Sequence, residues 1–337
     1  GARMAVAEIN EDGGVLNGRP LELIVEDNQT DPNISVRLTR KLIQEDDVTA
    51  LMGPVSSSAR NAMTEIAAEF KTPLLYGIDY EGGIYNRYLF CYSMIPDHYV
   101  KPLIPYLMEN YGKKFYVFGY DYIWPHKIAE AIKREVSTLG GEVTGIEFTP
   151  FGIQDYSKTF EKIKNTKADI LMLILPGTDG FRFLKQITDI GLKEKIKIAA
   201  MAADESYLKA LDAKSLEGVI SAVHFLSSLE NRETRKFVRN QKRMFGKNTE
   251  VTYATEAHYG LVKLFREAIK KAGTDNREQI ISAMENLTIV VGNGPVKMRK
   301  DHHMNLNIVI SEFTDGKLIE KQNIGLIVPE NQKKGNN

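Results

Sequence analysis

The chain has 337 residues, of which 43% are hydrophobic and 26% charged, proportions typical of a folded globular protein. Basic and acidic residues each number 44, so the formal net charge is zero and gives no general attraction for nucleic acid or an anionic membrane. The single cysteine, Cys91, excludes an intrachain disulfide and a metal site built from several cysteines.

The first part of the chain, up to about residue 95, alternates amphipathic segments with short apolar runs. The spacing of apolar residues predicts helices, and the serines at 56–58 are suited to cap the third of them. The predicted helices are 2–10, 35–46 and 56–70, and the predicted strands are 21–27, 49–54, 73–78 and 88–93.

The same alternation starts again after Pro96. Its longest apolar run, residues 170–176, is too short to span a bilayer, so the chain is predicted not to cross a membrane. The predicted helices are 98–111, 125–138, 155–165, 178–190 and a short one near 205–212, and the predicted strands are 114–120, 142–148, 169–176, 196–202 and 218–225.

Short buried strands that alternate with amphipathic helices indicate parallel sheets covered on both faces. Two such series with a break near residues 95–98 predict an α/β protein of two doubly wound lobes. In folds of this class, ligands bind at the loops that follow the carboxyl ends of the strands.

Those loops are rich in hydroxyl, aromatic and carboxylate side chains and contain almost no lysine or arginine. The nearest arginine, Arg60, falls inside a predicted helix. Facing loops of this kind would enclose a small polar ligand between aromatic walls, with Ser, Thr and Asp fixing its orientation. The loops are 53–59, 76–83, 119–125, 175–180 and 201–206.

Several segments resemble the type I periplasmic-binding-protein family, whose members include branched-chain amino acid, amide and urea receptors of ABC transporters. The opening segment to Pro32 looks like the family's first helix, glycine turn and second strand. Four further segments look like its amide-sensing and urea-binding branch: YEGG at 80–83, GYDYIWP at 119–125, LGGEVTGIEFTP at 139–150 and GPVKMRKDHHMN at 294–305.

The resemblance implies a non-enzymatic receptor that closes like a Venus flytrap on one small amide, urea-like compound or amino acid. It implies lobe one from residues 1–95 plus 226–304 and lobe two from 96–225 plus 305–337, with hinge crossovers near 94–98 and 223–228. An ABC permease in the membrane would be the partner, and the location would be periplasmic or extracellular, with or without a lipid anchor. The alternative is the sensing domain of an amide-responsive regulator or signalling receptor.

Matching positions in the family assign ligand contacts to both lobes. Structural roles compete with several of them: the serines as caps, Tyr76 as core, Trp124 as a support for the helix start and Asp204 as a cap. The eight assigned residues are Ser57, Tyr76, Ile78, Asp79, Tyr122, Trp124, Thr178 and Asp204. Because Asp79 and Asp204 are acidic and the loops lack basic residues, a ligand offering N–H donors is predicted.

The chain departs from the family pattern in two places. Asp79 replaces a neutral residue of the urea branch and Ile78 a hydroxyl residue of the amide branch. The family also begins with a strand and a ligand-contacting loop ahead of the helix at Ala2, so the first strand of lobe one is expected to be absent here.

No catalytic, cofactor or metal site is predicted. No nucleophile elbow, P-loop or dinucleotide-binding glycine pattern follows a predicted strand. His302 and His303 are adjacent, which in a strand would point them to opposite faces, and no third ligand is nearby in sequence. Structural roles are therefore predicted for both.

Overall fold

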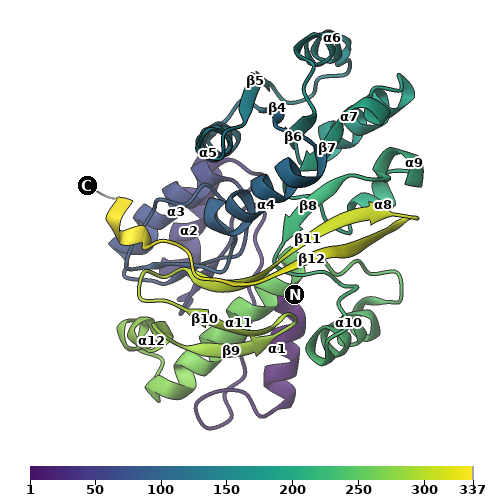
Figure 1. Cartoon of the computed structure of the whole chain (residues 1–337). Helices are drawn as coiled ribbons and strands as arrows, with labels where there is room; N and C mark the ends of the chain where they lie inside the picture. Colours follow the sequence, from purple (N-terminus) through teal and green to yellow (C-terminus); the bar gives the residue numbers. More distant parts are fainter. Residues whose placement is uncertain (336–337) are drawn as a thin grey trace. The chain divides into compact units, whose positions relative to one another are not determined.

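The computed structural model describes residues 1–335, and it confirms the predicted α/β class. The chain divides into two compact units (Figure 1). Of the described residues, unit 1 comprises 1–95, 230–306 and 328–335, and unit 2 comprises 96–229 and 307–327. Among the described residues no helix is long and apolar enough to cross a membrane.

Unit 1 contains six α-helices and five complete strands among its described residues. Local sequence explains several of the helix ends: Asp31 caps α2 by accepting from the backbone N–H groups of Asn33 and Ile34, and Thr252 and Thr255 form a capping box on α11. The elements are α1 (Ala2–Glu11), α2 (Pro32–Gln44), β1 (Leu51–Met52), α3 (Ser57–Glu69), β2 (Leu74–Tyr76), β3 (Leu89–Cys91), α10 (Arg232–Phe245), α11 (Tyr253–Ala272), α12 (Arg277–Met284), β9 (Thr288–Val291) and β10 (Gly294–Met298).

The sheet of unit 1 has the parallel order β1–β2–β3, and β9 and β10 form a separate antiparallel hairpin. Helix α1 packs against α11 through Ala5, Ile9 and Val262, and the two helices lie side by side in Figure 1. The carboxyl ends of β1 and β2 carry the loops that lead to Ser57 and to residues 77–83.

The strand predicted at 21–27 is wrong. These residues belong to no strand, and Ile24 and Val25 remain 39% and 63% exposed. A strand needs a hydrogen-bonded neighbour, and within residues 1–335 β1 pairs only with β2, which leaves the apolar pattern at 21–27 without a ladder.

Unit 2 is a doubly wound layer in which the strands β5–β4–β6–β7–β8 run parallel. The predicted elements recur with shifts of a few residues, and the strand predicted at 114–120 coincides with β4. The elements are α4 (Pro96–Tyr111), β4 (Lys114–Tyr120), α5 (Ile123–Thr138), β5 (Glu142–Thr149), α6 (Ser157–Thr166), β6 (Ile170–Ile174), α7 (Thr178–Asp189), β7 (Lys197–Ala200), α8 (Tyr207–Ala210), α9 (Ala213–Leu216) and β8 (Ile220–Val223).

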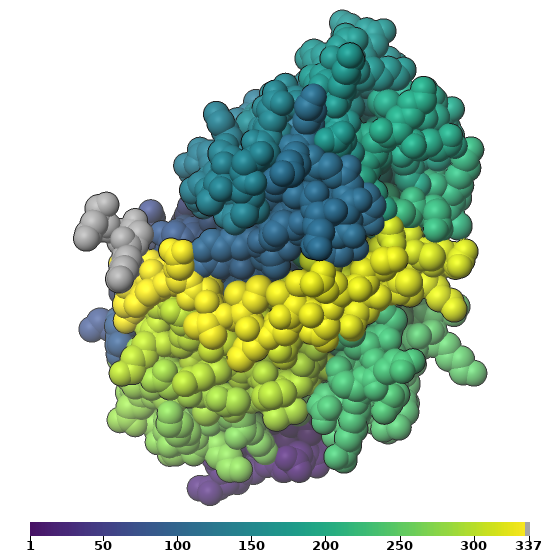
Figure 2. Space-filling view, in the orientation of Figure 1, coloured from purple at the N-terminus to yellow at the C-terminus, as the bar shows by residue number. Residues whose placement is uncertain are grey.

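Two long strands complete the fold. Strand β11 (Met304–Thr314) pairs with β10 through Met304 and Asn305 and antiparallel to β8 through residues 309–312. Strand β12 (Lys317–Ile327) pairs with β11, and its exposed side chains form part of the yellow surface in Figure 2.

The unit limits differ from the predicted lobe limits by a few residues at 226–229 and 305–306 and by a whole segment at the C-terminus. Residues 328–335 were assigned to lobe two, but they belong to unit 1. Their contacts there include the Arg299 guanidinium, which donates to the carbonyl of Pro329, and the Gln332 N–H, which donates to Asp301 Oδ2 at 3.1 Å. Sequence spacing gives no sign of such contacts.

Candidate functional site

Unit 1 contributes a polar and aromatic cluster around the start of α3. Ser56 is the N-cap, since its side chain accepts from the Ala59 N–H, and this leaves Ser57 as the first helical residue. The Ser57 hydroxyl donates to Glu81 Oε2 at 2.8 Å. The structure therefore gives the neighbouring serines different contacts: Ser56 caps the helix, and Ser57, the residue assigned from the sequence, contacts a carboxylate.

The side chains of Tyr76 and Asp79 both form hydrogen bonds to backbone groups of the protein. Tyr76 is fully buried, and its hydroxyl donates to the carbonyl of Val55 at 3.0 Å. Burial raises the pKa of Tyr76, which keeps this donor protonated. Asp79 is 8% exposed and its Oδ1 accepts from the Met94 N–H at 2.9 Å, while Ile78 between them is half-buried.

The side chains next to Ser57 that the sequence did not assign are Arg60 and Glu81. Arg60 Nη2 donates to Glu81 Oε1 at 2.8 Å, and the exposed side-chain fractions are 0% for Arg60 and 8% for Glu81. The guanidinium lies over the rings of Tyr80 at 4.4 Å and Tyr76 at 5.1 Å. The helical spacing that places Arg60 on the buried face, three residues after Ser57, was the available signal.

Unit 2 contributes an aromatic row at the carboxyl ends of β4 and β5. The Tyr122 ring stacks on Trp124 at 6.4 Å and on Phe151 at 5.7 Å, and Phe151 stacks on Tyr120 at 4.2 Å. Trp124 is only 5% exposed and its Nε1 donates to Tyr99 Oη at 3.3 Å, whereas Phe151 is 67% exposed. Tyr122 and Trp124 thus belong to a stacked row that includes two further rings, Tyr120 and Phe151, which the sequence did not assign.

The loop that carries Phe151 is fixed by a buried carboxylate. Asp179 Oδ2 accepts from the Gly152 N–H at 2.6 Å, and Asp179 Oδ1 accepts from Arg182 Nη1 at 2.7 Å. Thr178, the neighbour of Asp179, is the first residue of α7 and is exposed. The hydroxyl of Thr178 is therefore accessible, while Asp179 holds the adjacent loop in place.

Asp204 stabilises the turn before α8 and is not the N-cap that the sequence favoured, since the N-cap of α8 is Ser206. Its Oδ1 accepts from both the N–H and the hydroxyl of Ser206, at 2.9 and 2.5 Å. The next residue, Glu205, is 6% exposed and its Oε1 accepts from the Ser227 N–H at 2.6 Å. Burial raises the pKa of Glu205 to about 7.

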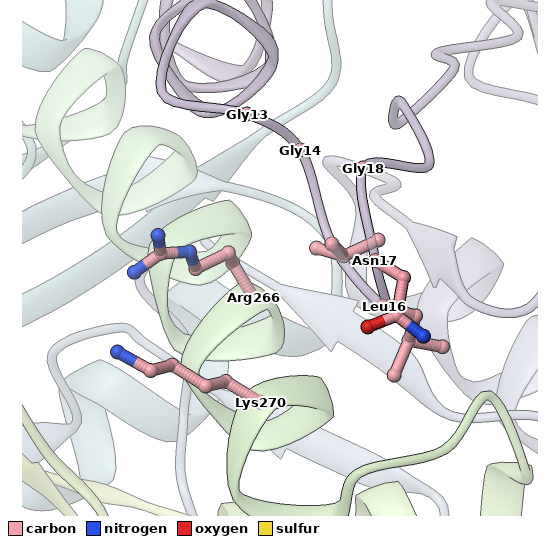
Figure 3. A pocket seen from close by; sticks show the side chains of 8 residues that line it. Gly13, Gly14, Leu16, Asn17, Gly18, Arg266 and Lys270 are labelled. Atoms are coloured by element: carbon pink, nitrogen blue, oxygen red, sulfur yellow. The ribbon is translucent and has the colours of Figure 1, made fainter.

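Two surface depressions of unit 1 lie away from this residue set. One, of about 290 Å³, is bounded by the glycine-rich turn 13–18 and by Arg266 and Lys270 of α11 (Figure 3). Arg266 is already paired with Asp12 and Glu267. The other, of about 490 Å³, lies beside the C-terminal segment and includes exposed lysines. Neither includes a predicted ligand residue.

The described residues offer no group of three or more His, Cys, Asp or Glu side chains placed to hold a metal ion. His302 and His303 lie in the turn before β11 rather than in a strand, and both are buried. His303 bonds to the Tyr80 hydroxyl, and His302 stacks on Phe90 at 3.9 Å. Their structural role is therefore packing within unit 1.

Comparison with known proteins places the chain in a family. The model of the periplasmic binding protein family matches residues 1–317. A Leu/Ile/Val-binding protein homolog 6 of Brucella abortus is 25% identical over 328 residues, which cover 94% of this chain and 84% of the relative. BraC3, a Leu/Ile/Val-binding protein of Rhizobium johnstonii, is 23% identical and covers 85% of this chain and 77% of its own length.

Solved structures agree on the fold. An amino acid ABC transporter substrate-binding protein from Pseudomonas fluorescens Pf-5 superposes with a TM-score of 0.89 at 21% identity, covering 99% of this chain and 92% of that chain. A solute binding protein of an ABC transporter from Rhodopseudomonas palustris BisB5, in complex with 3,4-dihydroxybenzoic acid, superposes with a TM-score of 0.87 at 22% identity. The match covers 98% of this chain and 92% of that chain.

The chain belongs to the periplasmic binding protein family. Its two compact units of helices and strands have the type I architecture of that family, as the sequence predicted. Members of the family are binding proteins rather than enzymes, in agreement with the prediction that this chain binds a small molecule and catalyses no reaction.

Proposed function

We propose that the chain is the solute receptor of an ABC importer and delivers a small amide, urea-like compound or amino acid to a membrane permease. The observation that carries this proposal is the character of the two residue sets. Unit 1 offers fixed hydrogen-bonding groups at Ser57 and Glu81, and unit 2 offers flat aromatic rings at Tyr122 and Phe151. Small-molecule sites are typically lined by aromatic and apolar side chains with a few well-placed polar groups.

Each of the eight assigned residues keeps a specific place in the proposal. Tyr122 and Thr178 are the side chains whose surroundings best suit direct contact with solute, and Ser57 acts through its hydrogen bond to Glu81. Ile78 is half-buried and adds apolar surface. Tyr76, Asp79, Trp124 and Asp204 support their loops through internal hydrogen bonds.

The solute class is supported by the low content of basic side chains in the strand-end loops. Structural neighbours include proteins solved with isoleucine and with hydroxybenzoates, both of which carry a carboxylate. In this chain the arginine nearest to Ser57 is already paired with Glu81. A neutral solute with N–H groups fits this arrangement without leaving an unpaired anion.

The test is a binding screen with single substitutions in each unit. Isothermal titration with acetamide, urea, leucine, benzoate and glucose identifies the solute class. Ser57→Ala in unit 1 and Phe151→Ala in unit 2 are then titrated with the solute that binds. The proposal expects each substitution to weaken binding of that same solute, and normal binding by both variants would contradict it.

We further propose that the protein acts in the periplasm, either free or held by a lipid anchor. Family membership supports the compartment. Cell fractionation of the natural full-length product, with and without detergent, tests both statements. Recovery in the cytoplasmic fraction would instead favour a sensor.

A further inference from the structure

A buried ion pair lies at the start of α3. Arg60 Nη2 donates to Glu81 Oε1 and the Ser57 hydroxyl donates to Glu81 Oε2, both at 2.8 Å. The same guanidinium nitrogen also donates to Asn61 Oδ1 at 3.0 Å. Glu81 is thus held by two donors that come from successive turns of one helix.

This ion pair is costly to bury, because two charges lose their hydration and a buried pair contributes little net stability. The guanidinium is also incompletely satisfied: within the described part of the chain, buried Arg60 Nε and Nη1 have no hydrogen-bond partner. A purely structural role would be served as well by apolar side chains of similar volume. The arrangement points to a requirement for charge at this place.

Exposure decides which member of the pair a solute can reach. The Arg60 side chain is 0% exposed, while Glu81 keeps 8%. Within the described residues each Glu81 oxygen accepts one hydrogen bond, and a carboxylate offers about four acceptor positions in all. Glu81 therefore keeps unused acceptor capacity on its accessible side.

The pair also reverses the electrostatic preference of the helix start. The N-terminus of a helix beside an arginine is normally favourable for an anion. Here Glu81 already forms an ion pair with the Arg60 guanidinium and accepts a hydrogen bond from the Ser57 hydroxyl. A solute carboxylate entering this place would meet a like charge and would have to displace Glu81 from Arg60.

We propose that Glu81 is the residue that accepts the solute's N–H groups, with Arg60 and Ser57 as positioning residues that hold its carboxylate in place. The matching solutes are primary amides and ureas, whose N–H groups can point together at one carboxylate. This inference rests on the receptor function proposed above and names the solute class. In this proposal Glu81 takes the place of Asp79, the acceptor predicted from sequence, and Asp79 supports its loop through the hydrogen bond from the Met94 N–H.

The main test uses Glu81→Gln, which keeps the shape of the side chain and replaces one acceptor oxygen by an N–H donor. Glu69→Gln, in the exposed ion pair with Arg40 at the end of the same helix, is the matched control. Titrations use acetamide, benzamide and urea against acetate and benzoate. We expect Glu81→Gln to weaken the amides and urea by at least tenfold and to leave the carboxylates unchanged or tighter, with no change in Glu69→Gln.

A structural role gives a different pattern. If Glu81→Gln lowers the Tm and weakens every solute by the same factor, or if amide affinity stays within twofold of wild type, the inference is overturned. Ser57→Ala, a small change, provides a second variant should Glu81→Gln fold poorly. Ser57→Ala is expected to weaken amides selectively, and equal weakening of all classes would count against the inference.

The role of Arg60 has its own readout. In Arg60→Gln the Glu81 carboxylate loses its charged donor and is held by the Ser57 hydroxyl alone, so amides and urea should bind more weakly than in wild type. Arg60→Lys, which keeps the positive charge, should restore part of that affinity. Equal weakening of all solute classes in Arg60→Gln, or unchanged amide affinity, overturns the assignment of Arg60.

These outcomes are separable from failure of the receptor proposal. Wild-type protein that binds none of the solute classes contradicts the receptor function itself. Wild-type protein that binds acetate, benzoate or glucose, with Glu81→Gln unchanged, preserves a receptor and overturns the choice of Glu81.

Discussion

Phe151 is an exposed ring that packs on one side and is free on the other. It is 67% exposed although it stacks on Tyr120 at 4.2 Å. Phe151→Ala should therefore change the free energy of unfolding by less than about 0.5 kcal/mol, as expected for a surface site. Loss of the ring as a contact surface should weaken solute binding by about 1–3 kcal/mol.

The measurement is a fluorescence titration that follows Trp124, the only tryptophan of the chain. Trp124 stacks on Tyr122, so a solute that contacts this row should alter its emission. Phe245→Ala, which removes a partly exposed ring from α10, is the control. Unaltered solute affinity in Phe151→Ala would remove Phe151 from the site.

The buried carboxyl of Glu205 leads us to expect that the free energy of unfolding depends on pH. Burial raises its pKa from 4.5 to about 7, so the folded protein binds this proton more tightly than the unfolded chain does. The stabilising contribution is complete below about pH 4.5 and is lost as pH rises through about 7. The loss is on the order of 3 kcal/mol at higher pH.

Glu205→Gln keeps an acceptor for the Ser227 N–H and cannot ionise. In urea unfolding, the variant should match wild type near pH 5 and be more stable at pH 8. The exposed substitution Glu194→Gln should show neither effect. Parallel stability curves for Glu205→Gln and wild type would refute the buried-carboxyl explanation.

At the residue scale, the sequence singled out loop 76–83 by its composition but did not specify the partners of its side chains. The acceptor predicted there was Asp79, whereas the structure leads us to propose Glu81. The choice depends on two contacts across the fold, from Met94 to Asp79 and from Arg60 to Glu81. Residue type and spacing do not specify such contacts, because they form only when distant segments meet.

At the scale of elements, two adjacent serines at the start of α3 are predicted to have different roles, one in capping the helix and one in solute binding. Ser56 accepts from the Ala59 N–H as the N-cap, and Ser57 donates to Glu81. Ser56→Ala should cost about 0.5–1 kcal/mol of unfolding free energy by removing the cap and should spare solute affinity. Ser57→Ala should do the opposite.

Chemical unfolding and titration of the two variants provide the comparison, and each serves as the control for the other. A loss of solute affinity in Ser56→Ala together with normal binding by Ser57→Ala would reverse the assignment.

Element prediction succeeded where local sequence and tertiary packing agree. Residues 114–120 are apolar and lie between β5 and β6, so the predicted strand coincides with β4. Residues 21–27 have an equally strand-like pattern, but a strand exists only when a neighbour supplies hydrogen bonds. The C-terminal segment was misassigned for a related reason, since Arg299 and Asp301 hold it in unit 1.

At the scale of the whole molecule, the balanced charge allows a test of solute chemistry by salt. The formal net charge is zero, so stabilisation by a solute does not arise from a general field. A neutral amide that bonds to a buried carboxylate should be nearly insensitive to ionic strength, whereas an anion held by exposed lysines should lose affinity as salt screens the charges.

The measurement is a thermal-shift screen of amides, urea, amino acids, carboxylates and sugars at low and high sodium chloride. A solute that binds only the folded state, at one hundred times its Kd, adds about 2.7 kcal/mol, which for a unit of this size corresponds to a rise in Tm of roughly 5–10 °C. We expect amides or urea to give this rise at both salt concentrations, because their bonds to Glu81 lie in a place that salt does not screen. A rise given only by carboxylates, and abolished by salt, would instead locate binding at the exposed lysines beside the C-terminal segment.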